Sequence, residues 1–203
     1  MENIKAVIFD FGGVLIDWNP YYLYRKVLPN DNEIAGFLQE TGILDWNYTF
    51  DQGYPFSLGI AELSRRFPQR AELIRMFDER WLETLGTTFD ATIELVKAVK
   101  AHGIPIYGLT NWSSEKFEQV RPQYKFMDLF EDIVVSGNVK IAKPDTRIYT
   151  LLLERNGLSA ANCLYIDDSK ENVRAARQVG LHAVIYQSSA QIRQELVVHG
   201  LLN

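Results

Sequence analysis

Residues 4–15 read IKAVIFDFGGVL, and this stretch decides the fold that the sequence predicts. The apolar, β-branched run at residues 4–9 predicts a buried strand. The strand ends at Asp10, and a glycine pair, Gly12 and Gly13, follows at once. A strand that stops at a carboxylate and a glycine pair is typical of the carboxyl end of a central strand, where α/β proteins place their sites.

Strands and helices alternate through the second half of the chain. Helices are predicted from Asp90 to Gly103, after the polar turn at 110–114, from Pro144 to Gly157, before Gly180 and from about Ser189. Further strands are predicted at residues 104–109, 132–135, 164–166 and 183–186. We therefore expect an α/β fold, a parallel doubly wound (Rossmann-like) three-layer sandwich.

Residues 18–88 interrupt this alternation. Their apolar spacing predicts helices at 21–28, 33–40, 58–67 and 71–85, with no strand. We expect a core domain made of residues 1–17 and 89–203, with a helical cap domain at residues 18–88. Residues 18–56 hold 10 of the 25 aromatic residues. These rings either line a pocket that faces the sheet or fix the insert to the core.

The composition restricts the partners of the protein. The formal net charge of −5 over 203 residues argues against a nucleic-acid binder, which needs a basic face. It leaves room for a small anionic substrate, because a metal ion and a lysine can reverse the field locally. The single cysteine, Cys163, lies in an apolar run and predicts a buried thiol. The sequence shows no secretion signal and no membrane span, so we expect a cytoplasmic protein with no membrane partner.

Polar residues gather at the carboxyl ends of the predicted strands, which meet in one crevice of a doubly wound sheet. They are Asp10, Thr110 with Asn111, and Asp167 with Asp168, and Lys143 lies in a nearby loop. Converging carboxylates repel one another unless a cation lies between them, and oxygen-only ligands favour magnesium over zinc. A lysine and a threonine hydroxyl suit a phosphate group. Taken singly, each of these residues is also typical of a turn, a helix cap or a solvated side chain.

Four motifs together resemble those of the haloacid dehalogenase superfamily. They are IFDFGGVL at 8–15, LTN at 109–111, Lys143-Pro144 after Ser136-Gly137-Asn138, and YIDDS at 165–169 with Asn172 beyond. Their order and spacing fit nearly the whole chain, and the helical insert matches the cap domain of that family. Gly12, two residues after Asp10, resembles the glycine that a subgroup of sugar-phosphate phosphatases has at this position.

The resemblance implies a magnesium-dependent phosphatase that hydrolyses a small phosphorylated metabolite, such as a sugar phosphate, through an aspartyl-phosphate intermediate. Asp10 is the implied nucleophile. The implied magnesium ligands are Asp10, the carbonyl of Gly12 and Asp168, with Asp167 in support. The implied phosphate-binding groups are Thr110, the Asn111 backbone and Lys143. Lys140 is a weaker candidate than Lys143, because no proline follows it.

Gly12 departs from the pattern of most phosphatases of this family, which carry an acid/base aspartate at that position. General acid–base help is typically worth roughly 10²–10⁴-fold in rate. Two hypotheses follow. Either the substrate has a leaving group that needs little protonation, such as an anomeric oxygen, a phenol or an acyl group, or another acid substitutes. Asp17 and an acid from the cap are the candidates for that substitute.

The same residues also allow functions other than a phosphatase. A 2-haloacid dehalogenase would use the same aspartate without a metal, but the paired acids at 167–168 replace its neutral side chains. A non-catalytic protein that binds a phosphate ligand is a second alternative, and a phosphomutase is a more remote one.

The expected pocket residues are Trp18, Tyr21, Arg25, Trp46 and Trp112. Each of them is also typical of a residue that only packs in the core.

Overall fold

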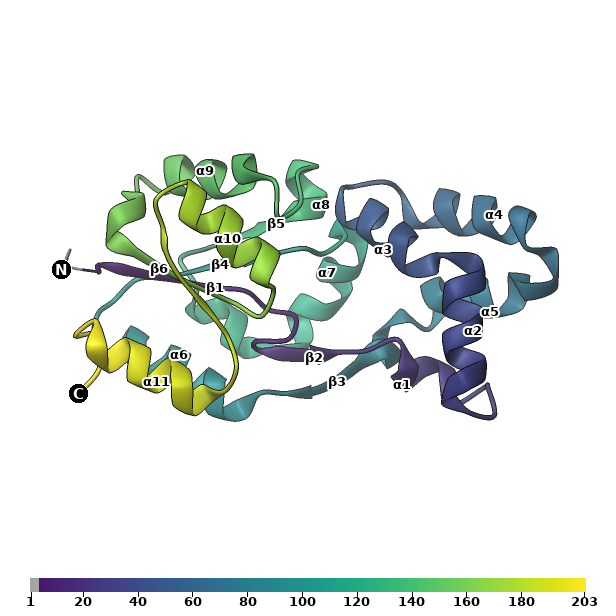
Figure 1. Cartoon of the computed structure of the whole chain (residues 1–203), viewed down its shortest axis with the longest axis horizontal. Coiled ribbons are helices and arrows are strands. Elements are labelled where there is room, and N and C mark those ends of the chain that lie inside the picture. The colour runs from purple at the N-terminus through teal and green to yellow at the C-terminus, as the bar shows by residue number, and fades with distance from the viewer. Residues whose placement is uncertain (1–3) are drawn as a thin grey trace.

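Five parallel strands form the central sheet of the computed structural model, which describes residues 4–203 (Figure 1). Their order is β5–β4–β1–β6–β7. The strands are β1 (Ala6–Phe9), β4 (Ile106–Thr110), β5 (Asp132–Val135), β6 (Cys163–Asp167) and β7 (His182–Ile185). The chain builds outward from β1 to one edge and then returns to its other side, which creates a switch point beside β1. The predicted parallel α/β fold is confirmed.

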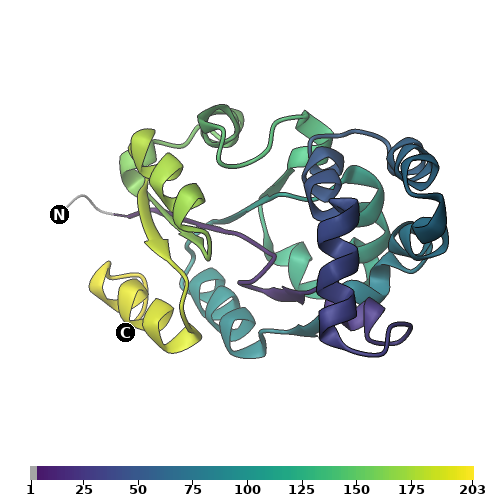
Figure 2. The ribbon, with the colours of Figure 1, turned by 45° about the vertical axis from the view of Figure 1, so that its right-hand side comes forward.

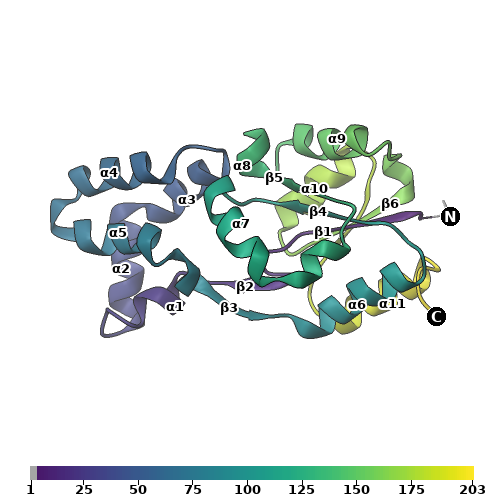
Figure 3. The ribbon, with the colours of Figure 1, turned by 180° about the vertical axis from the view of Figure 1, so that it is seen from behind.

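Helices cover both faces of this sheet (Figures 1 and 3). One face carries α8 (Ser136–Val139), α9 (Thr146–Arg155) and α10 (Lys170–Gln178), and the other carries α6 (Asp90–Ala101), α7 (Ser114–Val120) and α11 (Ser189–Val198). Alternate residues of β1 serve the two faces. Val7 and Phe9 belong to the cluster that contains α6 and α11, while Ala6 and Ile8 belong to the cluster of α9 and α10. The strand is apolar throughout because both of its faces are buried.

A helical lobe, defined here as residues 21–84, lies beyond the carboxyl ends of the strands (Figures 1 and 2). It contains α1 (Tyr21–Tyr24), α2 (Asp31–Thr41), α3 (Ile43–Asp51), α4 (Phe56–Arg66), α5 (Ala71–Glu79) and a 3₁₀ turn at Trp81–Thr84. Many of its aromatic rings pack on one another inside the lobe. The centroids of Phe50 and Phe56 are 4.1 Å apart, and those of Tyr24 and Phe37 are 4.8 Å apart. Some of the aromatic residues at 18–56 therefore build the core of the lobe itself, a role that neither of the two sequence hypotheses included.

Two short strands connect the lobe to the core. Residues Ile16–Trp18 (β2) and Leu85–Thr88 (β3) pair antiparallel, with Ile16 opposite Thr88 and Trp18 opposite Leu85. The prediction that residues 18–88 contain no strand is wrong at β3. Its four residues include a glycine and show no clear alternation, and each strand is stabilised by a partner far away in the sequence.

Two helix boundaries and one whole helix also differ from the sequence expectations. The first helix of the lobe ends at Tyr24 and the last at Glu79, because both segments continue as turns. Helix α3 was not predicted, since its polar and aromatic residues are mixed without a clear apolar face. Gly42, in a left-handed conformation with φ 62°, ends α2 and lets α3 begin directly.

The remaining global expectations concern the membrane and the cysteine. Among residues 4–203, no helix combines the length and the apolar character that a bilayer crossing requires. Cys163 is buried as predicted, and its thiol donates to the Ser159 carbonyl at 3.3 Å.

Candidate active site

Three carboxylates meet at the carboxyl end of the sheet. Asp10 follows β1, Asp167 ends β6, and Asp168 comes next. Because Phe9 pairs with Ile166 in neighbouring parallel strands, the residues that follow are brought side by side. One oxygen from each carboxylate lies within 4.8 Å of the others. Asp10 and Asp167 are buried, whereas Asp168 is exposed.

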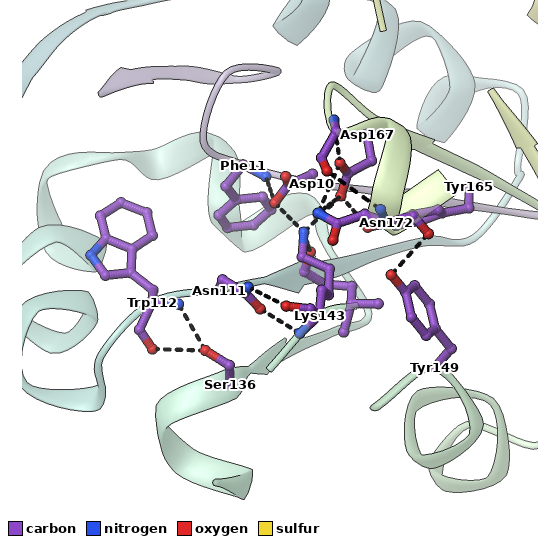
Figure 4. A network of polar contacts seen from close by, with 12 residues as sticks. Asp10, Phe11, Asn111, Trp112, Ser136, Lys143, Tyr149, Tyr165, Asp167 and Asn172 are labelled. Carbon is purple, nitrogen blue, oxygen red and sulfur yellow. Dashed lines mark hydrogen bonds and ion pairs between the residues drawn. The ribbon is translucent and has the colours of Figure 1, made fainter. Parts of the chain in front are cut away.

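The ammonium group of Lys143 lies between two of these carboxylates (Figure 4). Its Nζ is 2.7 Å from Asp10 Oδ1 and 2.8 Å from Asp167 Oδ2, and it donates to the Leu109 carbonyl at 2.9 Å. The side chain is almost fully buried, with 2% of the residue exposed. Lys140, the weaker candidate from the sequence, is exposed at the end of α8. The structure therefore brings Lys143, and not Lys140, to the carboxylates.

Asn111 fixes the loop that carries Lys143. Its side-chain amide donates to the Lys143 carbonyl at 2.9 Å, and its Oδ1 accepts from the Lys143 N–H at 2.8 Å (Figure 4). Thr110, the last residue of β4, is buried beside this clamp. The side chain of Asn111 thus positions the lysine, a contact that the sequence reading did not include.

Asp167 is surrounded by donors. Its oxygens accept from Lys143, from the Tyr165 hydroxyl, from the Ser169 N–H at 2.8 Å and from Asn172 Nδ2 at 3.1 Å. At Asp10, by contrast, the Phe11 N–H and Lys143 both bond Oδ1. Asp167 is therefore suited to orienting Lys143, and Asp10 and Asp168 are better placed to receive a cation.

The charges of the cluster are unbalanced. Burial raises the pKa of Asp10 well above its ordinary value, against the opposing charge of Lys143. Burial and the neighbouring Asp167 raise the pKa of Asp168. For Asp167, burial is outweighed by Lys143 and the hydrogen bonds, so its pKa is lowered. Three carboxylates against one ammonium group leave a negative surplus that a divalent cation would offset, and an oxygen-only donor set fits Mg²⁺.

The two glycines that follow Asp10 and Phe11 differ in the space that surrounds them. Gly13 has φ +73°, and a Cβ on it would lie 2.2 Å from Asp168 Oδ2, so only glycine leaves the Asp168 carboxylate in place. A Cβ on Gly12 would have no atom within 4 Å. The absence of a side chain at Gly12 is therefore not imposed by space.

A cavity of about 290 Å³ opens beside the carboxylates, between the sheet and the helical lobe. The core contributes Gly12, Gly13, Thr110, Asn111, Trp112 and Asp168; β2 contributes Ile16 and Trp18; and the lobe contributes Asn47, Asp51 and Trp81. The rings of Trp81 and Trp112 are 5.6 Å apart. The indole N–H groups of Trp18, Trp81 and Trp112 are buried without a hydrogen-bond partner in the described part of the chain. Ile16 and three tryptophans give the wall apolar surface, and polar groups lie both on the core side and on the side of the lobe.

The structure places two of the five expected pocket residues in this cavity. Trp18 and Trp112 line it. Tyr21 borders a separate depression on the lobe, and Arg25 pairs with Asp31 at 2.7 Å on the surface. Trp46 packs against Phe50 and Tyr54 rather than facing the cavity.

Five lining residues were missed by the sequence reading: Gly13 and Ile16 near the first strand, and Asn47, Asp51 and Trp81 of the lobe. Asn47 and Asp51 stand four residues apart, a spacing that places both on one face of a helix. Recognition of α3 would have revealed that face. Asp17, considered from the sequence as a substitute acid, accepts from the Tyr22 hydroxyl at 2.5 Å and is not part of the lining.

The family model for haloacid dehalogenase-like hydrolases matches residues 4–180. The chain belongs to this family of hydrolases. Its five-stranded parallel sheet with a helical insertion after the first strand and its cluster of strand-end aspartates agree with that assignment.

Curated relatives carry two kinds of names. The chain is 31% identical to the sesquiterpene phosphatase AstK of Aspergillus oryzae over 185 residues, 88% of either chain. It is 29% identical to a phosphorylated carbohydrates phosphatase of Thermotoga maritima, over 89% of this chain and 84% of that one. A (S)-2-haloacid dehalogenase of Pseudomonas putida is 23% identical over 89% of this chain and 83% of its own length.

Solved structures share the fold. A mutant of a family enzyme from Bacteroides thetaiotaomicron, in complex with magnesium and inorganic phosphate, superposes with a TM-score of 0.71. That match covers 91% of this chain and 95% of the other at 19% identity.

Proposed function

We propose that this protein is a magnesium-dependent phosphatase that hydrolyses a small phosphomonoester through an aspartyl-phosphate intermediate. The observation that carries the proposal is the position of Asp10, 2.7 Å from Lys143 and clustered with Asp168, which lines the cavity between the sheet and the lobe. A carboxylate, a cationic side chain and an oxygen-only metal cluster together suit an anionic phosphoryl group.

Each group has a defined task in this proposal. The Asp10 carboxylate attacks phosphorus, and Lys143 stabilises the negative charge of the attacking and transferring groups. The Thr110 hydroxyl and the Asn111 backbone N–H bind phosphoryl oxygens. Asp10, the Gly12 carbonyl and Asp168 would hold magnesium, with Asp167 as an indirect support through Lys143. When bound, the ion supplies charge stabilisation on the phosphoryl oxygens.

The helical lobe serves as the cap in this proposal, with the domain boundaries at 17/18 and 88/89. Asn47, Asp51 and Trp81 of the lobe complete the cavity wall. A cap in this position excludes water and selects the organic group of the substrate. We also propose a cytoplasmic location, because a single cysteine leaves no internal disulfide to maintain.

The wall of the cavity favours an organic group with at least one apolar face. Ile16, Trp18, Trp81 and Trp112 supply its large apolar side chains, and Asn47 and Asp51 add polar contacts. A sugar stacked on a ring and a compact terpenoid alcohol both meet this description. The names of the Thermotoga and Aspergillus relatives cover the same two classes.

The test measures phosphate release from a panel of sugar phosphates, aryl phosphates and isoprenoid monophosphates, with magnesium and with a chelator. Release that requires both magnesium and Asp10 supports the proposal, and Asp10→Asn provides the comparison. Asp145→Asn is the matched control, because Asp145 caps α9 and pairs with Arg147 on the surface.

A dehalogenase is the alternative outcome of that test. Chloroacetate turnover without added metal, together with no phosphate release from any ester, would replace the phosphatase by a dehalogenase. The paired acids at 167–168 argue against it, since Asp168 adds a further negative charge beside the nucleophile where an anionic haloacid would bind.

A further inference from the structure

We propose that Asp51, at the end of α3 in the helical lobe, is the general acid and base of the reaction. This inference rests on the proposed phosphatase function and adds the group that delivers a proton to the leaving oxygen. Position 12 has no side chain to do so, although it has room for one.

The cavity itself selects this residue. Among its lining residues only Asp51 and Asp168 are ionisable. Asp168 is one of the three clustered carboxylates, which leaves Asp51 as the acid that stands apart from them. Asp51 lines the same cavity as Thr110 and Asn111, where the phosphoryl group is expected. It is 9% exposed, so its remaining access is through the cavity wall.

The end of α3 is held against the loop that follows β4. Asn47 donates to Asp51 Oδ2 at 3.2 Å, and Asp51 forms a hydrogen bond with the backbone of Ser113. Two glycines allow close packing there. A Cβ on Gly53 would lie 2.8 Å from the Gly137 carbonyl, and a Cβ on Gly137 would lie 2.5 Å from the backbone nitrogen of Ser114. This packing keeps the carboxyl of Asp51 beside the loop that follows β4, where the Asn111 N–H is proposed to bind a phosphoryl oxygen.

The charge state of Asp51 suits an acid. Burial raises its pKa to about 8, while the Ser113 hydrogen bond and the charge of Lys143 lower it. On the neighbouring elements, Lys140 of the α8 end lies against Gly53, and Glu115 of α7 accepts from the Phe56 N–H at 3.3 Å. At neutral pH the carboxyl therefore carries a proton, which is the form that a leaving alkoxide requires.

The two steps balance. In the first, an oxygen of Asp10 bonds to phosphorus, the phosphorus–oxygen bond of the ester breaks, and the Asp51 proton passes to the departing oxygen, which leaves as an alcohol. In the second, the Asp51 carboxylate takes a proton from water while the water oxygen bonds to phosphorus. The phosphorus–oxygen bond to Asp10 breaks, inorganic phosphate leaves, and both aspartates return to their starting forms.

A purely structural role is the competing explanation, because Asp51 also ties the lobe to the core. Leaving groups separate the two roles. Benzyl phosphate and 4-nitrophenyl phosphate have similar size and shape, but benzyl alkoxide is strongly basic and needs a proton, whereas 4-nitrophenolate leaves without one. The value of kcat/KM reports only the steps up to the first irreversible one, so it isolates the departure of the leaving group.

The experiment measures kcat/KM for both esters, with magnesium, in the wild type, Asp51→Asn, Asp51→Glu and Asp45→Asn. Asp45→Asn is the matched control, an exposed residue of the same helix. We expect Asp51→Asn to lower kcat/KM for benzyl phosphate by roughly 10²–10⁴-fold and for 4-nitrophenyl phosphate by less than about 10-fold. Asp51→Glu should recover part of the benzyl activity, and Asp45→Asn should match the wild type.

The pH dependence is the second measurement. For benzyl phosphate, the wild-type kcat/KM should fall as the pH rises through about 8, and this limb should be absent in Asp51→Asn. Equal losses on both esters, or no loss on either, would overturn the role of Asp51. Failure of the wild type to release phosphate from either ester in an Asp10-dependent way would instead overturn the proposed function.

Discussion

Replacing Gly13 by alanine tests the geometry of the proposed magnesium site most directly. A Cβ at this position would lie 2.2 Å from Asp168 Oδ2 and 2.7 Å from Asp168 Cγ, and the backbone has φ +73°. The left-handed conformation costs a non-glycine residue about 1–2 kcal/mol, and the Asp168 carboxylate must also move away. For a chain of this size, that cost lowers Tm by roughly 2–8 °C. Because Asp168 is displaced, magnesium should bind at least about 10-fold more weakly.

Gly12→Ala is the matched control, since no atom lies within 4 Å of its Cβ. It should leave the free energy of unfolding within about 1 kcal/mol of the wild type. Urea unfolding gives the stability of each variant, and magnesium titration by calorimetry gives the affinity. If Gly13→Ala is as stable as Gly12→Ala and binds magnesium as tightly, then the contact between Gly13 and Asp168 does not organise the site.

Three further outcomes follow from the carboxylate cluster and from Asp51. Lys143→Met should abolish phosphate release and lower the free energy of unfolding by about 3–5 kcal/mol, because it leaves a buried carboxylate pair without its cation. Lys140→Met, at an exposed position, should change the free energy of unfolding by less than about 0.5 kcal/mol, as measured by urea unfolding. Raising the pH from about 4 to about 8 without magnesium should destabilise the wild type relative to Asp51→Asn, since a carboxyl with a raised pKa contributes stability that is lost as the pH rises to its folded value. Magnesium at roughly 100 times its Kd should add about 2.7 kcal/mol of stability to the wild type in a thermal melt, and none to Asp168→Asn if that carboxylate is a ligand.

The core of the fold could be predicted from the sequence because its strands are buried on both faces. Each strand therefore appears as a short apolar run, and the polar Asp10 directly follows the run of β1. The predicted set of strand-end residues meets in space, since parallel neighbours deliver their carboxyl ends to one edge. Lys143 could be distinguished from Lys140 by the proline that follows it, and the structure places only Lys143 beside Asp10.

The wall of the cavity could not be predicted in the same way. Whether an aromatic residue packs inside the lobe or faces the cavity depends on which side of its helix touches the core. Trp46 turns toward Phe50, while Asn47, the next residue, lines the cavity. The strands β2 and β3 depend on a partner about 70 residues away along the chain, and no local period encodes such a pairing.

The β2–β3 pair has an evolutionary consequence. The chain leaves the core at Ile16 and returns at Thr88, and these two residues are direct partners in the ladder. An insertion whose ends already touch can be exchanged for a longer, shorter or unrelated one without redirecting the strands of the core. In this protein the exchangeable part also carries Asp51. A single grafting event at this ribbon would therefore replace the cavity wall of the lobe and the proposed proton donor together, while Asp10 and Lys143 stay where they are.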